Sequence, residues 1–488
     1  MVAGIAGVLG DVNQFDALED MLKAIKHRGP NSMRLHRADR FCGGALASNL
    51  SKARGEGSAQ DSTTTVLVDG EVYNEREDGE SDAQVVLRLY HQYGRTFASH
   101  LEGVFACAIF DGDSVLLARD AVGVRPMYWG TTEDDCLCFA SEAKALVGVC
   151  DDVTELPPGT TYSSSTGLAA YLPHYPPVVM PETLENTAKA LRKCMTEAVA
   201  RRLEDGAVGA CLLSGGLDSS IIAAAAKELG ADIPLITVGM DGAPDLENAR
   251  IMAEHLGMAH HVFLYDAEQI RQSVPRAVYM LESFDEDCVS GAISNLFASQ
   301  KASEYTNCIL SGEGGDELFG GYHLLKDLPG EAEQLKMMDR LIAIAYNTAV
   351  QRLDRAMMGN SITYRTPFID TAVIAFALQL PVRWKIHAAA DGRLVEKYIL
   401  REAFKDLLPE RIYRREKLRF SAGTGTDNLM DDVADGQADM PAFDESSRTT
   451  AEGYTLNSPK ELWYYRLFKE KFPAPCFENL VGRWDPDK

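Results

Sequence analysis

The chain has 488 residues, more than one hydrophobic core usually holds, so we expect two domains. Its 46% of hydrophobic and 25% of charged residues are typical of a globular protein. The formal net charge of -24 argues against broad binding to nucleic acids or anionic membranes, because phosphate groups attract clustered Lys and Arg. No apolar run is long enough to span a bilayer, and the first residues lack the features of a signal peptide. We therefore expect a cytoplasmic protein that acts on small molecules.

The ten cysteines are scattered along the chain. Even the near neighbours Cys136 and Cys138 lack the spacing of metal ligands. This distribution predicts reduced, buried thiols.

The first 150 residues predict an antiparallel sheet layered with a few helices. Short alternating strands that end at Gly and Asp are expected at residues 65–68, 104–110 and 115–118, and helices at 15–25 and 83–93. A stretch rich in Pro, Gly and Ser follows between residues 156 and 177. It marks the expected boundary between a domain of residues 1–175 and a domain of residues 176–488.

The second domain begins with apolar residues at helical spacing from Leu184 to Leu203, and this pattern stops at Gly206. Strands then alternate with helices: strands at 208–213, 234–238, 261–264 and Cys308–Leu310, helices at 219–229 and 246–256. Such alternation predicts parallel strands joined by right-handed crossovers. From about Leu335 we expect helices only, and we expect the polar, acidic stretch 427–450 to form a loop.

The segment Ser-Gly-Gly-Leu-Asp-Ser-Ser (residues 214–220) stands where an apolar strand ends and a helix begins. Ligands of parallel sheets bind at such places. Two glycines let the backbone approach a phosphate, and the free N–H groups of the helix's first turn donate to it. The Asp218 carboxylate would repel a bare phosphate, so its natural partner is a bound Mg²⁺. The alternative interpretation, without a ligand, is a common turn in which Asp or Ser caps the helix.

A second glycine-rich segment follows the strand at Cys308–Leu310. Residues 311–322 carry five glycines and three carboxylates. Crowded carboxylates repel one another, and a metal or cationic ligand offsets that repulsion. At the ends of two parallel strands, Asp218 and Asp316 could hold Mg²⁺ on a pyrophosphate. The alternative is an acidic surface loop.

These segments resemble a known family. Residues 214–220 are similar to the pyrophosphate loop of the ATP-pyrophosphatase superfamily, and residues 311–322 to a motif of class B asparagine synthetases. Further similar motifs are Arg-Thr-Pro-Phe-Ile-Asp (365–370), Glu-Lys-Tyr-Ile-Leu-Arg (396–401) and Arg-Glu-Lys-Leu-Arg-Phe-Ser (415–421). The resemblance covers nearly the whole chain. It implies an α+β Ntn-hydrolase-like N-terminal domain of the glutamine amidotransferase type. The second domain would be an α/β ATP-pyrophosphatase domain (adenine nucleotide α-hydrolase-like) with a parallel sheet.

The resemblance also implies a reaction, in which a substrate carboxylate attacks the α-phosphate of ATP and ammonia then attacks the acyl-adenylate. Residues implied to bind ATP are Leu212, Ser214, Gly215, Gly216, Asp218, Ser219, Ser220, Val238, Ser311 and Gly312. Asp218 and Asp316 would hold Mg²⁺. Lys417 would contact the phosphates, and Glu313 would take a proton from the attacking nitrogen. For Lys417 the alternative is a solvated lysine between two arginines. Family members often form homodimers, which is therefore expected here.

The N-terminal domain departs from the family pattern. Glutamine-dependent members begin Met-Cys-Gly-Ile, and their cysteine is the nucleophile. This chain begins Met-Val-Ala-Gly-Ile, so Ala3 stands in its place. Asp69 replaces the first Asn of the family's Asn-Gly-Glu-Ile-Tyr-Asn, whereas Asp82 matches the acid expected to hold the glutamine amine. We expect a degenerate amidotransferase domain without glutaminase activity.

A second departure concerns the acid substrate. Asparagine synthetases carry an Arg in a Thr-Thr-Ile-Arg-Ala-Ser segment, and an ungapped placement puts Ser290 there. Loss of an Arg removes a bidentate clamp for a carboxylate or phosphate. This change puts aspartate in doubt as the substrate.

Three hypotheses follow. The first is an ammonia-dependent amide ligase with aspartate as its default acid. The second is a relative with a different acid or amine nucleophile, similar to beta-lactam synthetases or lasso-peptide cyclases, although Glu313 stands where the beta-lactam branch carries Tyr. The third is a non-catalytic scaffold, which the intact Asp218, Glu313, Asp316 and Lys417 disfavour.

Overall fold

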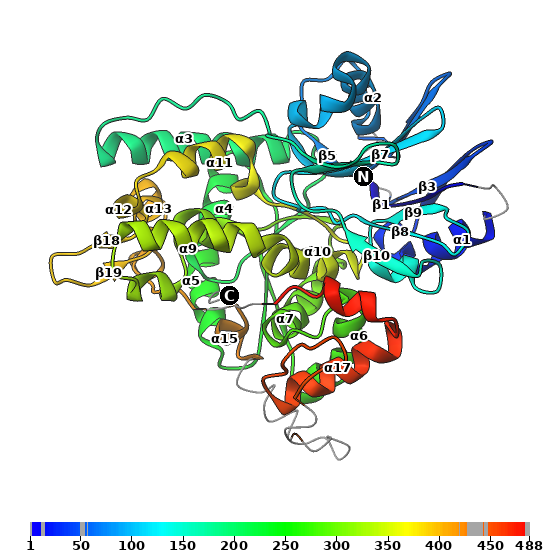
Figure 1. Ribbon diagram of the computed structural model, residues 1–488. Coiled ribbons are helices and arrows are strands. Elements are labelled where there is room, and N and C mark those ends of the chain that lie inside the picture. Colours follow the sequence, from blue (N-terminus) through cyan, green and yellow to red (C-terminus); the bar gives the residue numbers. More distant parts are fainter. Residues whose placement is uncertain are drawn as a thin grey trace.

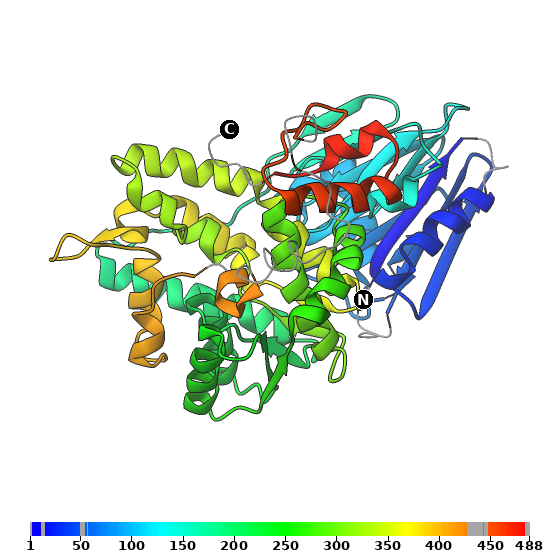
Figure 2. The same cartoon turned by 90° about the horizontal axis from the view of Figure 1, so that it is seen from below.

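The computed structural model describes residues 2–10, 15–48, 54–55, 57–418, 420–426, 443 and 448–483. Figure 2 shows the N-terminal strands and helix α1 on one side of the molecule and the parallel sheet with most of its helices on the other. Most of the stretch expected to form a loop, residues 427–450, lies outside the described residues.

The N-terminal part is built from antiparallel strands. They are β1 (Val2–Leu9), β2 (Ser32–Ala38), β3 (Phe41–Ala47), β4 (Ser58–Gln60), β5 (Thr64–Val72), β6 (Gly103–Asp111), β7 (Ser114–Arg119), β8 (Tyr128–Thr131), β9 (Leu137–Ala140), β10 (Asp152–Glu155), β11 (Thr160–Ser163) and β12 (Gly167–Ala170). The strand order is β10-β8-β9-β1-β5-β6-β7-β11-β12, with β2-β3 joined to β1 and β4 to β5. Strands β1 and β5 share a single residue pair, Val2 with Gly70, so two groups of strands meet there.

Alternation of side chains explains why these two groups stack (Figure 1). Ile5 of β1 and Leu67 of β5 contribute to one buried cluster between the groups. Val8, on the opposite face of β1, packs with helix α1 (Phe15–Ala24). Val66, on the opposite face of β5, packs with helix α2 (Asp82–Tyr93). The result is a helix–sheet–sheet–helix arrangement, and it confirms the predicted antiparallel layers and both predicted helices.

The C-terminal part contains a parallel sheet of five strands in the order β15-β14-β13-β16-β17. Its strands are β13 (Ala210–Leu212), β14 (Leu235–Gly239), β15 (His260–Leu264), β16 (Cys308–Leu310) and β17 (Thr363–Arg365). The principal helices are α3 (Leu184–Leu203), α4 (Leu217–Glu228), α5 (Pro244–Leu256), α6 (Ala267–Leu281), α7 (Glu286–Ala302), α9 (Glu331–Ile344), α10 (Ala349–Met358), α11 (Thr371–Gln379) and α17 (Pro459–Lys471). Shorter elements are α8 (Gly315–Phe319), α12 (Val382–Lys385), β18 (His387–Ala388), β19 (Leu394–Val395), α13 (Tyr398–Phe404), α14 (Glu410–Tyr413) and α15 (Phe420–Thr424).

The order in which strands are added to the sheet changes sides at β13. From β13 the chain runs through α4 to β14 and through α5 to β15, whereas β16 and β17 lie on the other side of β13. Right-handed crossovers therefore place α4 and α5 on one face and α7 and α10 on the other. The carboxyl ends of β13 and β16 lie next to each other at this switch point, where ligands of parallel sheets bind.

The predicted alternation of strands and helices is confirmed, with ends that differ by a few residues. The expectation of helices only after Leu335 is wrong, because β17, β18 and β19 interrupt them. Strand β17 reads Thr-Tyr-Arg and lacks the apolar run that marks the equally short β16, and β18 and β19 have only two residues each. Of the described helices, none combines the length and the apolar character that crossing a bilayer requires. All ten cysteines are free thiols, and eight of them are buried, as predicted.

Buried ion pairs join the two parts of the chain. Arg28 donates to Asp354 of α10 at 2.7 Å and to Glu142 at 2.8 Å, and Arg125 donates to Asp354 at 2.8 Å. These four side chains are all at most 1% exposed. Buried charges require partners. The network therefore holds the N-terminal part against α10.

A candidate nucleotide and acid site

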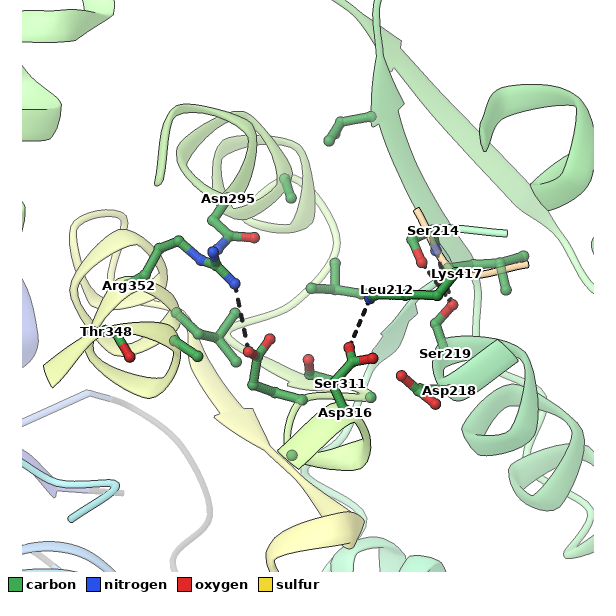
Figure 3. A pocket seen from close by; sticks show the side chains of 18 of the residues that line it. Leu212, Ser214, Asp218, Ser219, Asn295, Ser311, Asp316, Thr348, Arg352 and Lys417 are labelled. Atoms are coloured by element: carbon green, nitrogen blue, oxygen red, sulfur yellow. Dashed lines mark hydrogen bonds and ion pairs between the residues drawn. The ribbon is translucent and has the colours of Figure 1, made fainter. Parts of the chain in front are cut away.

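A cavity of about 290 Å³ opens at the carboxyl edge of the parallel sheet (Figure 3). Its walls come from the ends of β13, β14 and β16, from α7 and α10, and from the segment around Lys417. A smaller cavity adjoins it, and both are lined by Ser214, Asp218, Ser219 and Lys417.

The loop after β13 has the geometry of a phosphate cradle. Gly215 has φ +72°, and an added Cβ would come within 2.6 Å of the Ala249 backbone nitrogen, so only glycine fits. Gly216 is the N-cap of α4, and no side chain caps the helix. Instead, the Ser219 hydroxyl accepts from the Ser214 N–H at 3.1 Å and holds the loop back on itself. The first turn of α4 thus keeps N–H groups for an anion.

The loop after β16 lies directly against that turn. A Cβ on Gly312 would stand 2.7 Å from the Ser219 nitrogen, and a Cβ on Gly315 would stand 2.8 Å from the Asp218 carboxyl carbon. Both glycines therefore permit a close approach of the two loops. This approach brings Glu313 and Asp316 into the same cavity as Asp218.

Two lysines neutralise the facing carboxylates. Lys397 Nζ lies 2.5 Å from Asp218 Oδ2 and 2.6 Å from Asp316 Oδ1. Lys417 Nζ lies 2.7 Å from Asp316 Oδ2. Lys397 has φ +51°, a conformation that a non-glycine residue adopts at a cost. The strained backbone places its ammonium group between the two carboxylates.

These contacts set the charge states of the site. Burial raises the pKa of Asp218. Although burial opposes it, the ammonium groups of Lys397 and Lys417 lower the pKa of Asp316. Burial raises the pKa of Glu313, and the Arg352 guanidinium opposes that rise. A carboxylate with a raised pKa is suited to accept a proton near neutral pH.

The carboxylate pair fits a magnesium ion. Among the described residues, the buried Asp218 Oδ1 has no hydrogen-bond partner. Carboxylate oxygens are the ligands that Mg²⁺ prefers, and they usually bind it together with substrate phosphates.

Ten of the residues implied to act in the site line the main cavity: Leu212, Ser214, Asp218, Ser219, Val238, Ser311, Gly312, Glu313, Asp316 and Lys417. Gly216 lines the adjoining cavity. Ser220 is fully buried in α4 and lines neither cavity, because the helical turn directs it into the core. Ser290 is buried in α7 and does not line them either.

Among the polar residues of the site that the sequence analysis missed are Lys397, Arg352 and Asn295. Lys397 belongs to a motif quoted for the resemblance, but its role could be found only from its contacts. Arg352 and Asn295 line the cavity from α10 and α7. No local motif marks either of them.

The N-terminal domain has its own acidic centre, and the chain's own side chains occupy it. Asp82 accepts hydrogen bonds from Arg76 and Arg54 and, at 3.1 Å, from the Val72 N–H. Asp69 accepts from Ser141 at 2.7 Å and from Arg28 at 3.2 Å.

Comparisons with known proteins agree with this architecture. Residues 190–347 and 326–475 match the asparagine synthase family, and residues 2–200 match the glutamine amidotransferase domain. The chain is 30% identical to "Asparagine synthetase [glutamine-hydrolyzing]" of Zea mays over 99% of its own length and 89% of the relative's. It is 31% identical to the nodule asparagine synthetase of Pisum sativum over 96% of its length and 86% of the relative's. The predicted fold classes, an Ntn-type amidotransferase domain and an ATP-pyrophosphatase domain, are confirmed. The chain belongs to the asparagine synthetase family and, with it, to the ATP-dependent, AMP-forming carbon–nitrogen ligases.

Proposed function

We propose that this enzyme adenylates the side-chain carboxylate of aspartate, transfers the acyl group to free ammonia and has no glutaminase activity. One observation carries the proposal. Two carboxylates, Asp218 and Asp316, face each other beside Glu313 and are neutralised by Lys397 and Lys417 at the carboxyl edge of the sheet. This is the charge arrangement that a reacting triphosphate and an incoming amine need.

In the first step, a carboxylate oxygen of the acid attacks the α-phosphorus of ATP, and the bond to pyrophosphate breaks. The first turn of α4 and its preceding loop bind the pyrophosphate through N–H groups and the hydroxyls of Ser214 and Ser219. Lys417 offsets the negative charge that develops around the α-phosphorus. A magnesium ion held by Asp218 and Asp316 would supply further positive charge for the phosphates.

In the second step, ammonia attacks the acyl carbon and AMP leaves. The adduct must lose a proton before the amide forms. Glu313 lines the same cavity, and burial raises the pKa of its carboxyl, so it serves as the acceptor.

Three features of the N-terminal domain support the loss of glutaminase activity. Ala3 offers no nucleophile. The Asp82 carboxylate, expected to hold an amine, already has two guanidinium partners. Asp69 provides an acceptor where the family has an amide donor. Its carboxylate already accepts hydrogen bonds from Arg28 and Ser141.

The test is release of AMP and pyrophosphate from ATP and Mg²⁺ in the presence of aspartate, with ammonium, glutamine or no nitrogen source. We expect stoichiometric AMP, pyrophosphate and asparagine with ammonium but not with glutamine. Turnover with glutamine would refute the loss of glutaminase activity. Absence of turnover with aspartate under every condition would refute the assigned acid, and a panel of other carboxylic acids would then follow.

A further inference from the structure

The main cavity has two ends of different chemistry. Figure 3 shows Asp218, Ser219 and Lys417 at one end and Arg352 and Thr348 at the other. The first end is the phosphate end, so the reacting carboxylate must lie there. Whatever the acid substrate carries beyond its reacting carboxylate extends toward Arg352.

Arg352 has hydrogen-bonding capacity to spare. Its side chain is 22% exposed, and its ion pair with Glu313 is long, at 3.5 Å. Within the described part of the chain, its buried Nε has no hydrogen-bond partner. By contrast, Arg365 donates to both Glu71 and Asp205 at 2.7 Å. A guanidinium has five N–H donors in a planar fork, which suits a carboxylate.

Helix α7 leaves room for this guanidinium. A Cβ on Gly291 would stand 2.6 Å from Arg352 Cδ and 2.8 Å from Nη1. Glycine in a helix interior costs about 1 kcal/mol relative to alanine, so its presence here has a packing reason. The Arg352 side chain thus reaches the cavity by passing over Gly291, which has no side chain to block it.

We propose that Arg352, seated against Gly291, binds a second carboxylate of the acid substrate and so selects dicarboxylic acids. The inference rests on the proposed adenylation of an acid at the phosphate end. It also resolves the doubt raised by Ser290. Residue 290 points away from the cavity, and the clamp comes from α10 instead of α7.

The experiment measures acid-dependent pyrophosphate release with ATP, Mg²⁺ and ammonium. Three acids distinguish the contributions of the second carboxylate and the amine of aspartate. Aspartate has two carboxylates and an amine, succinate keeps both carboxylates, and 3-aminopropionate lacks the second carboxylate. The wild-type chain is compared with Arg352→Ala, with Gly291→Ala and with Arg383→Ala, a control on a side chain that is 64% exposed.

We expect Arg352→Ala to lower kcat/KM about 100-fold for aspartate and succinate, mainly through KM, because it removes the partner of a buried carboxylate. The same change should leave 3-aminopropionate within about threefold of its wild-type value, and the KM for ATP unchanged. Gly291→Ala keeps the charge but displaces the guanidinium, so kcat/KM should again fall selectively for the dicarboxylic acids. Arg383→Ala should behave as wild type.

Equal losses for all three acids in Arg352→Ala would overturn the proposal, since Arg352 would then act only through Glu313. A failure of the proposed function looks different. The wild-type chain would release no pyrophosphate with aspartate, and the same comparison would be made with a panel of mono- and dicarboxylic acids. If the chain then activated monocarboxylic acids as well as their dicarboxylic counterparts, the inference would fail on its own.

Discussion

Glu313 lies between opposing charges, and from these surroundings we expect it to act in one step of the proposed reaction. Arg352 approaches it from one side, and Asp316 and Lys417 share the cavity on the other. Among the described residues, the ion pair of Glu313 is with Arg352 and not with a group expected to bind phosphate. Its role should therefore concern the incoming nitrogen rather than the nucleotide.

We predict that Glu313→Gln separates adenylation from amide formation. Glutamine keeps the size of the side chain but cannot accept the proton, so asparagine formation should fall about 100- to 1,000-fold. Positional isotope exchange in ATP, which reports reversible adenylation, should persist in the presence of aspartate. If the exchange fell as much as the overall rate, Glu313 would be needed for the nucleotide step instead.

Asp218→Asn should abolish both steps. The amide is nearly isosteric, but it lacks the charge that pairs with Lys397 and that a magnesium ion requires. AMP release should disappear while the thermal unfolding midpoint changes little. Asp391→Asn, on a side chain that is 51% exposed, is the matched control and should retain full activity. Full activity of Asp218→Asn would rule out the metal assignment.

At the scale of elements, helix α10 links the site to the N-terminal domain. Arg352 lines the cavity, whereas Asp354 and Arg355 form ion pairs with the buried residues Arg28 and Glu282. Asp354 forms ion pairs with Arg28 and Arg125 of the N-terminal domain. The position of Arg352 thus depends on a domain that has no residue in the catalytic cavity.

Asp354→Ala should destabilise the protein by about 3–5 kcal/mol, because it leaves two buried guanidinium groups with fewer partners. Urea unfolding followed by circular dichroism would measure this loss. Asp391→Ala removes an exposed carboxylate and should change the free energy of unfolding by less than about 0.5 kcal/mol. A loss for Asp354→Ala as small as that of the control would show that the network contributes little.

Helix α12 carries a buried lysine that makes stability depend on pH. Lys385 is 3% exposed, and burial lowers its pKa to about 8 from an ordinary 10.5. Below pH 8 both folded and unfolded states bind the proton, and the folded state carries the cost of a buried charge. Between about pH 8 and 10.5 the folded state loses its proton first, so stability rises with pH in this range.

Lys385→Met keeps the volume and removes the charge. It should stabilise the protein at pH 7 by up to about 3 kcal/mol, and this advantage should vanish near pH 10.5. Urea unfolding at both pH values checks the prediction, with the exposed Lys336→Met of α9 as control. A difference between variant and wild type that does not change with pH would contradict the assigned cause.

At the scale of the whole molecule, we expect the N-terminal domain to act as a structural support. Arg365, the last residue of β17, donates to Glu71 of the N-terminal domain at 2.7 Å, and Arg54 donates to Asp205 at 2.9 Å. Glu71 and Asp205 are thus each paired with an arginine of the other domain across the interface.

Ala3→Cys should therefore not restore glutaminase activity. The nucleophile would return, but Asp82 would stay paired with Arg54 and Arg76, and Asp69 would still lack an N–H donor. Glutamate release from glutamine should remain at background for Ala3→Cys and for the wild type. Measurable release by the variant would show that the pocket still accepts glutamine.

Much of the site could be predicted from the sequence because its parts are local. Each phosphate loop is a short run in which glycines, hydroxyls and carboxylates follow a strand, and backbone geometry makes such a run recognisable alone. The parallel sheet could be predicted because strands and helices alternate with clear periods. Strand β17 was not predicted because its sequence, Thr-Tyr-Arg, lacks the apolar run that marks the equally short β16.

The sequence by itself determined the family, the two fold classes and the carboxylates at the strand ends. Only the tertiary structure decided which distant side chains complete the site. Lys397 and Arg352 reach it from segments far along the chain from Asp218, and Gly291 has meaning only because Arg352 lies against it. Ser290 illustrates the same limit. A helix turns by about 100° per residue, so one position along α7 separates Gly291, which lies against Arg352, from Ser290, which is buried and does not line the cavity.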